Sequence, residues 1–250
     1  MTGTLYLIPN TLGTDSPEAA DPLGSLIPDA VQSITRGLDY FIAENAKTTR
    51  AFLKLLSRQH ALVRPLQEID IAELNINTGS VKLPALLAPL LAGRDAGLVS
   101  EAGVPAVADP GADLVRLAHL HAIRVRPLVG PSSLLLALMA SGLNGQSFAF
   151  NGYLPTDPSL RSKRIKALEE RSRQDWQTQL FIETPYRNGV VLDALCAACQ
   201  GQTLICVATD LSLESESVRT QATSQWKAEL AAGRTPNFHK KPTVFLMLAE

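Results

Sequence analysis

Two successive junctions of strand, loop and helix constrain this chain more than any other feature of its sequence. The first strand ends at Val99, and the loop Ser100–Gly111 joins it to a helical pattern at 112–121. The second strand, Ile123–Leu128, is joined by the loop Gly130–Ser133 to an apolar helical pattern. In open α/β sheets ligands bind outside the carboxyl ends of strands, where such loops converge. The sequence therefore predicts a binding pocket at these two loops.

Each loop also has a purely structural explanation. Asp109 followed by Pro110 is typical of a helix N-cap with proline at the first helical position, where its missing N–H costs nothing. Gly103 and Pro105, however, interrupt the chain without starting a helix. Glycine lets the main chain approach a ligand closely, and proline fixes the shape of the loop. This pair of residues favours a binding loop over an ordinary turn.

The first half of the chain alternates between strands and helices. Strands are predicted at Leu5–Ile8 and Leu38–Ala43, and helices at Asp29–Arg36, Lys47–Arg58 and Ser80–Ala92. Such alternation predicts a mainly parallel sheet that is covered on both faces.

The second half has a different order. After a helix at Ser159–Arg173, the strands Gln179–Glu183 and Thr203–Thr209 flank a helix, and a polar run at Ser212–Thr220 precedes the last helix and the strand Thr243–Leu248. Strands that follow one another in this way predict a mixed sheet. The polar, proline-bearing stretch 144–158 is the expected crossing between two α/β domains, residues 1–145 and 146–250.

Composition excludes several classes of protein. The 23 basic and 24 acidic residues give a formal net charge of -1, so the whole chain has no basic field to attract nucleic acid, although local basic patches remain open. The apolar run Leu83–Ala92 is too short to cross a membrane, and it is broken by prolines. Leu5–Ile8 is preceded by no basic region of the kind found in signal peptides. A cytoplasmic protein is expected.

The cysteines predict neither a redox site nor a metal site. Cys196 and Cys199 have redox spacing, but they come late in a helical pattern, where no helix N-terminus activates a thiolate. Neither they nor Cys206 have the histidine or cysteine partners of a zinc site. We interpret all of them as buried, small apolar residues.

Several segments match one family of proteins. Leu98–Gly111 resembles a segment of the tetrapyrrole methylase superfamily, in particular of its ribosomal small-subunit methyltransferase I branch. In that branch the segment reads leucine-valine-serine-aspartate-alanine-glycine-threonine-proline and, a few residues later, aspartate-proline-glycine. Val125–Leu143, Phe148–Pro155 and Ile182–Arg187 are similar to three further motifs of that branch. The resemblance runs from about residue 3 to the end of the chain and is dense between Leu98 and Arg187.

This resemblance implies two α/β domains with S-adenosylmethionine held in the cleft between them, usually in a homodimer. Bent loops expose backbone N–H groups to the carboxylate and adenine of this cofactor, and a permanent cation beside its sulfonium would be unfavourable. By position in the family, the cofactor-binding residues are expected to be Ser100, Gly103, Val104, Pro105, Val107, Ser133, Leu134, Ala208 and Thr243.

Methyl transfer to a hydroxyl also needs a proton acceptor within hydrogen-bonding reach. Glu44, Glu101 and Glu183 lie at or just after predicted strand ends and are the candidates, but each of them also has the ordinary interpretation of a surface carboxylate.

The segment expected to face the acceptor departs from the branch. Its alanine-glutamate-aspartate-threonine-arginine-histidine-threonine-arginine run is replaced by Ala43–Arg50, in which Asn45, Ala46 and Thr48 stand for the acid, the threonine and the histidine. This change favours an acceptor other than the branch's 16S rRNA cytidine ribose.

Three functions remain open. The first is an S-adenosylmethionine-dependent methyltransferase whose acceptor, RNA or a small molecule, is undetermined. The second is the rRNA ribose methyltransferase of the branch, which predicts basic helix faces. The third is a non-catalytic module that binds the cofactor or dimerises. A nicotinamide-dependent dehydrogenase is disfavoured because no glycine-rich fingerprint follows the first strand. The basic faces would be supplied by Lys47, Arg50, Lys54 and Arg58 and by Arg161, Lys163, Arg164 and Lys166.

Overall fold

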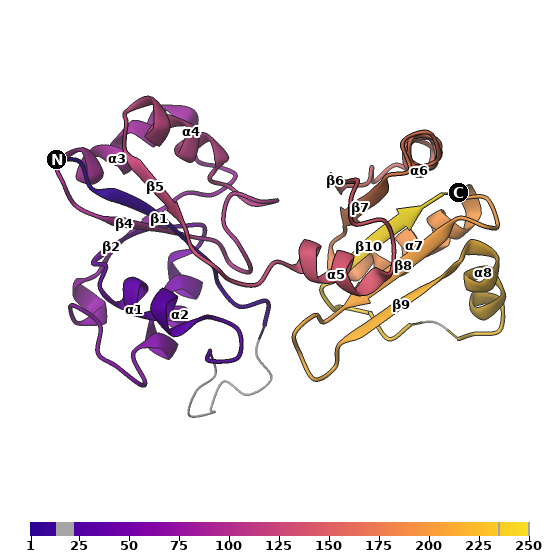
Figure 1. Cartoon of the computed structure of the whole chain (residues 1–250), viewed down its shortest axis with the longest axis horizontal. Helices are drawn as coiled ribbons and strands as arrows, with labels where there is room; N and C mark the ends of the chain where they lie inside the picture. The colour runs from indigo at the N-terminus through magenta and orange to yellow at the C-terminus, as the bar shows by residue number, and fades with distance from the viewer. Residues whose placement is uncertain (14–22, 235, 250) are drawn as a thin grey trace. The chain divides into compact units, whose positions relative to one another are not determined.

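Two sheets, each with its own helices, make up the fold (Figure 1). The computed structural model describes residues 1–13, 23–234 and 236–249. The chain divides into two compact units, Met1–Ser132 and Ser133–Glu250. The two domains expected from the sequence, with a boundary between residues 145 and 146, stay a prediction about which parts of the chain fold independently.

All neighbouring strands of the first sheet are parallel, in the order β3-β2-β4-β1-β5. Their carboxyl ends therefore lie along one edge of the sheet, and the prediction of a mainly parallel sheet is confirmed. The strands are β1 (Thr4–Ile8), β2 (Tyr40–Ala43), β3 (Asp70–Glu73), β4 (Ala96–Val99) and β5 (Arg124–Pro127).

Helices cover both faces of this sheet. One face packs Leu98 and Ile42 against Leu87 and Leu114 of α3 and α4, and the other packs Phe41 against α1 and α2. The side chains of a strand alternate between the two faces, so neighbours such as Phe41 and Ile42 belong to different cores. The helices are α1 (Asp29–Arg36), α2 (Ala46–Leu56), α3 (Leu83–Leu91) and α4 (Ala112–Leu120), with short 3₁₀ turns η1 (Leu66–Glu68) and η2 (Ser80–Lys82).

The second sheet has the order β6-β7-β10-β8-β9 and is mixed, as predicted. Only β6 and β7 are parallel, and the other neighbouring pairs are antiparallel. The strands are β6 (Phe148–Tyr153), β7 (Thr178–Ile182), β8 (Leu204–Thr209), β9 (Ser217–Ala222) and β10 (Thr243–Leu248).

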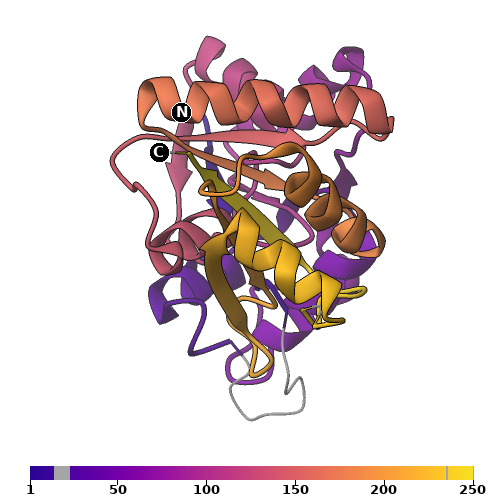
Figure 2. The same ribbon diagram turned by 90° about the vertical axis from the view of Figure 1, so that its right-hand side faces the viewer.

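One face of the second sheet packs against three helices of the second unit. Figure 2 shows helices of this unit in front of the sheet. Ile165, Val191 and Trp226 from these helices enclose Phe245 of the central strand in a buried core. The helix α5 packs on β8, β9 and β10 and belongs to the second unit. The helices of this unit are α5 (Ser133–Ser141), α6 (Pro158–Asp175), α7 (Asn188–Ala198) and α8 (Thr223–Ala231), with the 3₁₀ turn η3 (Pro185–Arg187).

Candidate active site

The loops that follow β1 and β4 are bound to each other at the carboxyl edge of the first sheet. The backbone N–H of Asn10 donates to the carbonyl of Gly103 at 2.8 Å, and the N–H of Gly103 donates to the carbonyl of Thr11 at 3.3 Å. After β1 the chain continues to β2, which lies on one side of β1 in the sheet. After β4 it passes over β1 to β5, which lies on the other side. Such a reversal of strand order is where open α/β sheets bind ligands.

The loop 100–111 has an unusual backbone. The φ angles of Gly103, Ala106, Ala108 and Gly111 are all positive, at 66°, 64°, 66° and 136°. Alanine rarely adopts this region, and strained backbone of this kind is concentrated at functional sites. Gly103 thus has a backbone conformation that glycine adopts readily, and its close approach to a ligand stays a prediction.

Gly103 also lies close to two other loops. A Cβ atom at this position would lie 3.3 Å from Leu12 and 3.6 Å from the carbonyl oxygen of Pro131. In the same region, a Cβ atom at Gly130 would overlap the ring of Pro9. The loops after β1, β4 and β5 therefore approach one another closely at this edge of the sheet.

The predicted cofactor residues of this loop are exposed to different degrees. Ser100, Gly103 and Pro105 are buried, Val104 is half-buried, and Val107 is exposed. Small residues leave the peptide groups of this loop accessible. N–H groups can donate to the carboxylate of S-adenosylmethionine, and N–H and C=O groups can bind the edge of its adenine.

The predicted cofactor residues of the second unit are in more regular structure. Ser133 and Leu134 open α5 and are half-buried. Ala208 in β8 and Thr243 in β10 are buried within the second sheet, and the Thr243 hydroxyl accepts a hydrogen bond from Asn188 at 3.1 Å. Their roles at a cofactor stay predictions.

Two of the predicted proton acceptors are brought together. The carboxylate of Glu44, just after β2, accepts a hydrogen bond from the backbone N–H of Glu101 at 3.1 Å. The carboxylate of Glu101, just after β4, accepts one from the side-chain amide of Asn45 at 3.1 Å. These carboxylates belong to neighbouring strand ends, as their positions in the sequence suggested.

Asp109, in the loop after β4, is a third carboxylate in this group. The N-cap of α4 is Gly111, without a side-chain cap, so the N-cap role expected for Asp109 is wrong. The Asp109 carboxylate instead accepts a hydrogen bond from Ser100. Burial, together with the charges of Glu44 and Glu101, raises the pKa of Asp109 to about 6, although the hydrogen bond from Ser100 lowers it.

Glu183, the remaining proton acceptor predicted from the sequence, lies in the second unit and is 6% exposed. Its carboxylate accepts a hydrogen bond from the N–H of Thr184 at 2.8 Å and pairs with Arg187 at 3.3 Å. These contacts indicate that Glu183 fixes the turn after β7, and its burial shows that it is not a surface carboxylate.

The two predicted basic faces differ. Lys47, Arg50 and Lys54 are exposed on α2. On α6, in contrast, Arg161 is 7% exposed and donates to the carbonyls of Pro155 and Thr156, so its inclusion in an exposed basic face is wrong.

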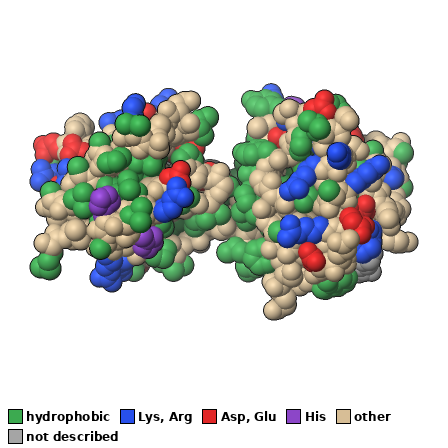
Figure 3. All heavy atoms as spheres, turned by 90° about the horizontal axis from the view of Figure 1, so that it is seen from above, with side chains coloured by type: hydrophobic (Ala, Val, Ile, Leu, Met, Phe, Trp, Pro, Cys, Tyr) green, Lys and Arg blue, Asp and Glu red, His purple; other side chains and the backbone are tan. Residues whose placement is uncertain are grey.

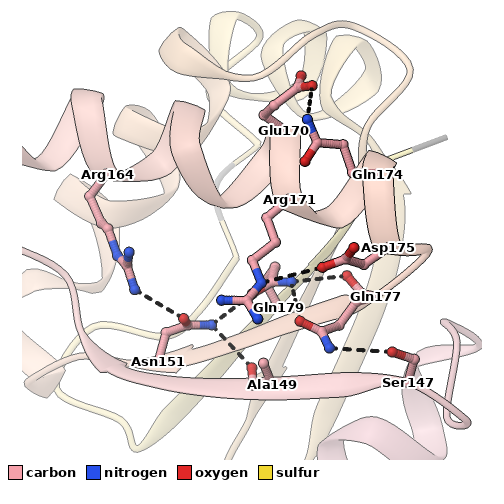
Figure 4. A network of polar contacts seen from close by, with 10 residues as sticks. All are labelled: Ser147, Ala149, Asn151, Arg164, Glu170, Arg171, Gln174, Asp175, Gln177 and Gln179. Carbon is pink, nitrogen blue, oxygen red and sulfur yellow. Dashed lines mark hydrogen bonds and ion pairs between the residues drawn. The ribbon is translucent and has the colours of Figure 1, made fainter.

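The remaining cations of α6 lie beside a network of amides. Figure 4 shows Arg164 donating to Asn151 of β6 at 3.1 Å, and Asn151 donating to Gln179 of β7 at 3.0 Å. Lys163 and Lys166 are exposed, and Figure 3 shows Lys and Arg side chains gathered over this part of the second unit. A basic surface therefore exists on α6 without Arg161.

Cys196, Cys199 and Cys206 are free thiols and buried, which confirms that they are core residues. Among the residues that the structure describes, no group of histidine, cysteine and carboxylate side chains is arranged to hold a metal ion. Within the same residues, no helix is both long enough and apolar enough to cross a membrane.

Comparison with curated proteins identifies relatives with one function. Ribosomal RNA small subunit methyltransferase I from Xylella fastidiosa is 32% identical over 216 residues, which are 86% of this chain and 71% of that protein. The protein of the same name from Mesorhizobium japonicum is 38% identical over 153 residues, and this match spans 61% of the chain and about half (51%) of that relative. No family model matches the chain.

Solved structures of other methyltransferases share the fold. The methyltransferase CobJ superposes with a TM-score of 0.62 at 16% identity, over 99% of this chain and 95% of that one. Uroporphyrin-III C-methyltransferase from Thermus thermophilus, in complex with S-adenosylhomocysteine, superposes with a TM-score of 0.57 at 15% identity, over 98% and 97%. Both the predicted fold class and the predicted resemblance are confirmed. This chain belongs to the ribosomal RNA small subunit methyltransferase I family.

Proposed function

We propose that the chain methylates RNA of the small ribosomal subunit on a ribose hydroxyl. The acceptor comes from its relatives, which carry the name ribosomal RNA small subunit methyltransferase I at 32% to 38% identity. The observation that carries the proposal is the group of carboxylates at the strand ends, Glu44, Glu101 and Asp109. A hydroxyl acceptor has a high pKa, and its methylation requires a group that accepts its proton, which these carboxylates can supply.

The substitutions that pointed to a different acceptor have a local explanation. The Asn45 side chain caps α2 by accepting from the N–H groups of Lys47 and Thr48, and the Thr48 hydroxyl donates to the Asn45 carbonyl. These residues therefore shape the start of a helix, while the carboxylates come from Glu44 and the loop after β4. Their change from the pattern of the branch leaves proton-accepting groups in place.

The cofactor is proposed to lie against Ser100, Gly103, Val104, Pro105 and Val107. S-adenosylmethionine supplies an electrophilic methyl group on a positively charged sulfur. The backbone N–H groups of this loop suit its carboxylate and adenine, and the nearby carboxylates of Glu44 and Glu101 provide a negative potential that favours its positive charge. Ser133, Leu134, Ala208 and Thr243 are proposed as further contacts on the basis of the family resemblance alone.

RNA is proposed to contact the exposed cations of α2 and α6. Lys47, Arg50 and Lys54 recur on one side of α2 at spacings of three and four residues, and Lys163 and Lys166 are exposed on α6. Such side chains attract phosphates without reading sequence. They compensate locally for a net charge of -1.

The active form is proposed to be a cytoplasmic homodimer. Ribosomal RNA as the acceptor supports the compartment. Exposed apolar side chains of the second unit support self-association, among them Leu135 and Met139 of α5, which are 52% and 79% exposed. Sedimentation equilibrium distinguishes a dimer from a monomer directly.

The proposed acceptor is tested with a radiolabelled methyl donor. Purified chain is incubated with small ribosomal subunits from a strain that lacks the family's enzyme and, as a matched control, with subunits from the parent strain, in which the site is already methylated. Label is expected in RNA of the first preparation alone. Label in total protein or in small-molecule extracts, with none in RNA, would replace rRNA by another acceptor.

A further inference from the structure

A cavity of about 450 Å³ lies on the α3 and α4 side of the first unit, beside the carboxylate group. We propose that this cavity receives the nucleoside to be methylated, and that the Asp109 carboxylate in its wall takes the proton from the attacking hydroxyl. The inference rests on the proposed function, because it deepens the role of the acceptor at that same site.

The walls of the cavity suit an uncharged nucleoside. Leu74, Ile76 and Leu83 supply apolar surface for a flat ring, and Asn75 and Thr78 supply polar edges for its hydrogen-bonding groups. The volume is in the range of pockets that bind small organic molecules. No lysine or arginine is among the described residues that line it, so phosphates are expected to stay outside, on the basic helices.

Asp109 is the member of the carboxylate group that faces this cavity. Glu44 and Glu101 are not part of the lining, and their carboxylates are held by the backbone N–H of Glu101 and by Asn45. Asp113 also lines the cavity, but it is paired with Arg116 at 2.9 Å at the surface.

Asp109 is also held in place. The positive φ angles of Ala106 and Ala108 (64° and 66°) shape the backbone just before it, and the hydroxyl of the buried Ser100 donates to its carboxylate. A fixed carboxylate loses less entropy on meeting a substrate hydroxyl than a mobile one.

Methyl transfer needs only the methyl donor, the attacking hydroxyl and the Asp109 carboxylate. The hydroxyl oxygen forms a bond to the methyl carbon while the bond from that carbon to sulfur breaks and its electron pair stays on sulfur. The hydroxyl proton passes to Asp109, which later releases it to solvent. A carboxyl group with a pKa of about 6 is a stronger base than an ordinary aspartate and is still ionised at neutral pH.

Single-turnover methylation of unmethylated small subunits, at saturating cofactor, tests the assignment. Asp109→Asn is expected to lower the rate by about 10²–10⁴-fold while the Kd for S-adenosylhomocysteine stays within about threefold of the wild type. Asp193→Asn, which changes an exposed carboxylate on α7, is the matched control and is expected to keep the wild-type rate. Ser80→Trp, which fills the cavity, is expected to raise the KM for subunits without changing cofactor binding.

The pH dependence of the wild-type rate is a second readout that needs no variant. The charged groups that act on Asp109 are Glu44 and Glu101 at the strand ends. Asp113 lines the same cavity and is paired with Arg116. The rate is expected to rise about tenfold per pH unit up to about pH 6 and then to level off.

Each outcome decides a different claim. An active wild type together with a fully active Asp109→Asn variant, or with a rate that does not depend on pH across this range, overturns the assignment of Asp109 and leaves the proposed function standing. A folded wild type that binds S-adenosylhomocysteine but methylates no ribosomal RNA overturns the proposed function and this inference with it.

Discussion

The side chain of Asn10, after β1, donates to the backbone carbonyl of Glu101, after β4, at 3.0 Å. The same amide reaches the carbonyl of Ser100 at 3.2 Å, and Asn10 is 6% exposed. Asn10 thus ties the loop 100–111, which carries most of the proposed cofactor contacts, to the neighbouring strand end.

Replacing Asn10 by alanine is expected to loosen this loop. Loss of the side-chain bonds leaves the buried carbonyl of Ser100 without this partner, which costs about 1–3 kcal/mol of folding free energy. We expect the Kd for S-adenosylhomocysteine to rise about tenfold in calorimetry. Asn77→Ala, at an exposed position, is the control. Unchanged affinity in Asn10→Ala would show that the loop does not need this tether to bind the cofactor.

Gly103→Val is expected to weaken cofactor binding, because valine at a φ of 66° is strained and its side chain would crowd Leu12. Gly233→Val is the matched control, since Gly233 also has a positive φ (72°) but nothing within 4 Å of an added Cβ. Both variants carry a backbone cost of about 1–2 kcal/mol. A bulky residue at Ser133 is expected to weaken binding as well. If Gly103→Val and the Ser133 variant bind the cofactor normally, these loops are not its site.

The Asp109 carboxyl is expected to destabilise the fold above about pH 6. Its pKa is raised from 3.8 to about 6, so between these values the folded chain binds a proton that the unfolded chain has lost, and stability falls as pH rises. The shift corresponds to at most about 3 kcal/mol, which solvent screening reduces to roughly 1–2 kcal/mol.

Asp109→Asn is therefore expected to be more stable than the wild type at about pH 8 and equal to it below about pH 4, as measured by urea denaturation. Asp193→Asn serves as the control here too. A wild type whose stability relative to Asp109→Asn does not change with pH would argue against a raised pKa.

The thiols are expected to be unreactive in the folded chain. Burial raises the pKa of Cys196 to about 11, of Cys199 to about 12 and of Cys206 to about 11, so almost no thiolate is present near neutral pH. Ellman's reagent is expected to modify none of them rapidly in the native state and all of them in concentrated guanidinium chloride. Rapid reaction of Cys196 or Cys199 in the native state would reopen the redox interpretation.

Helices and buried strands could be predicted well from the sequence because their patterns are set by burial. The strand at Leu5–Ile8 and the helix at Asp29–Arg36 fall within a residue or two of β1 and α1. Among the edge strands, β5 was predicted but β3, β6 and β9 were not. The stretch predicted as a polar run overlaps β9, and the stretch predicted as a domain crossing contains β6. An edge strand buries less of its side chains, so its sequence lacks apolar alternation.

The backbone of the candidate site was predictable where a glycine indicates an unusual conformation, as at Gly103, whose role at a cofactor stays a prediction. Asp109 was misassigned because an aspartate before a proline has the same sequence pattern whether it caps a helix or not. The positive φ angles of Ala106 and Ala108 turn the chain so that Gly111 begins α4 and Asp109 contacts Ser100. Alanine gives no local indication of such a backbone.

The most direct test of the central claim is mass spectrometry of nucleosides from the methylated RNA. Small subunits from a strain that lacks the family's enzyme are incubated with the chain and S-adenosylmethionine, and their RNA is digested to nucleosides. We predict the stoichiometric appearance of one 2′-O-methylated nucleoside, with none formed when the cofactor is omitted. A base-methylated nucleoside, or no new nucleoside from a folded chain that binds S-adenosylhomocysteine, would contradict a ribose hydroxyl of small-subunit RNA as the acceptor.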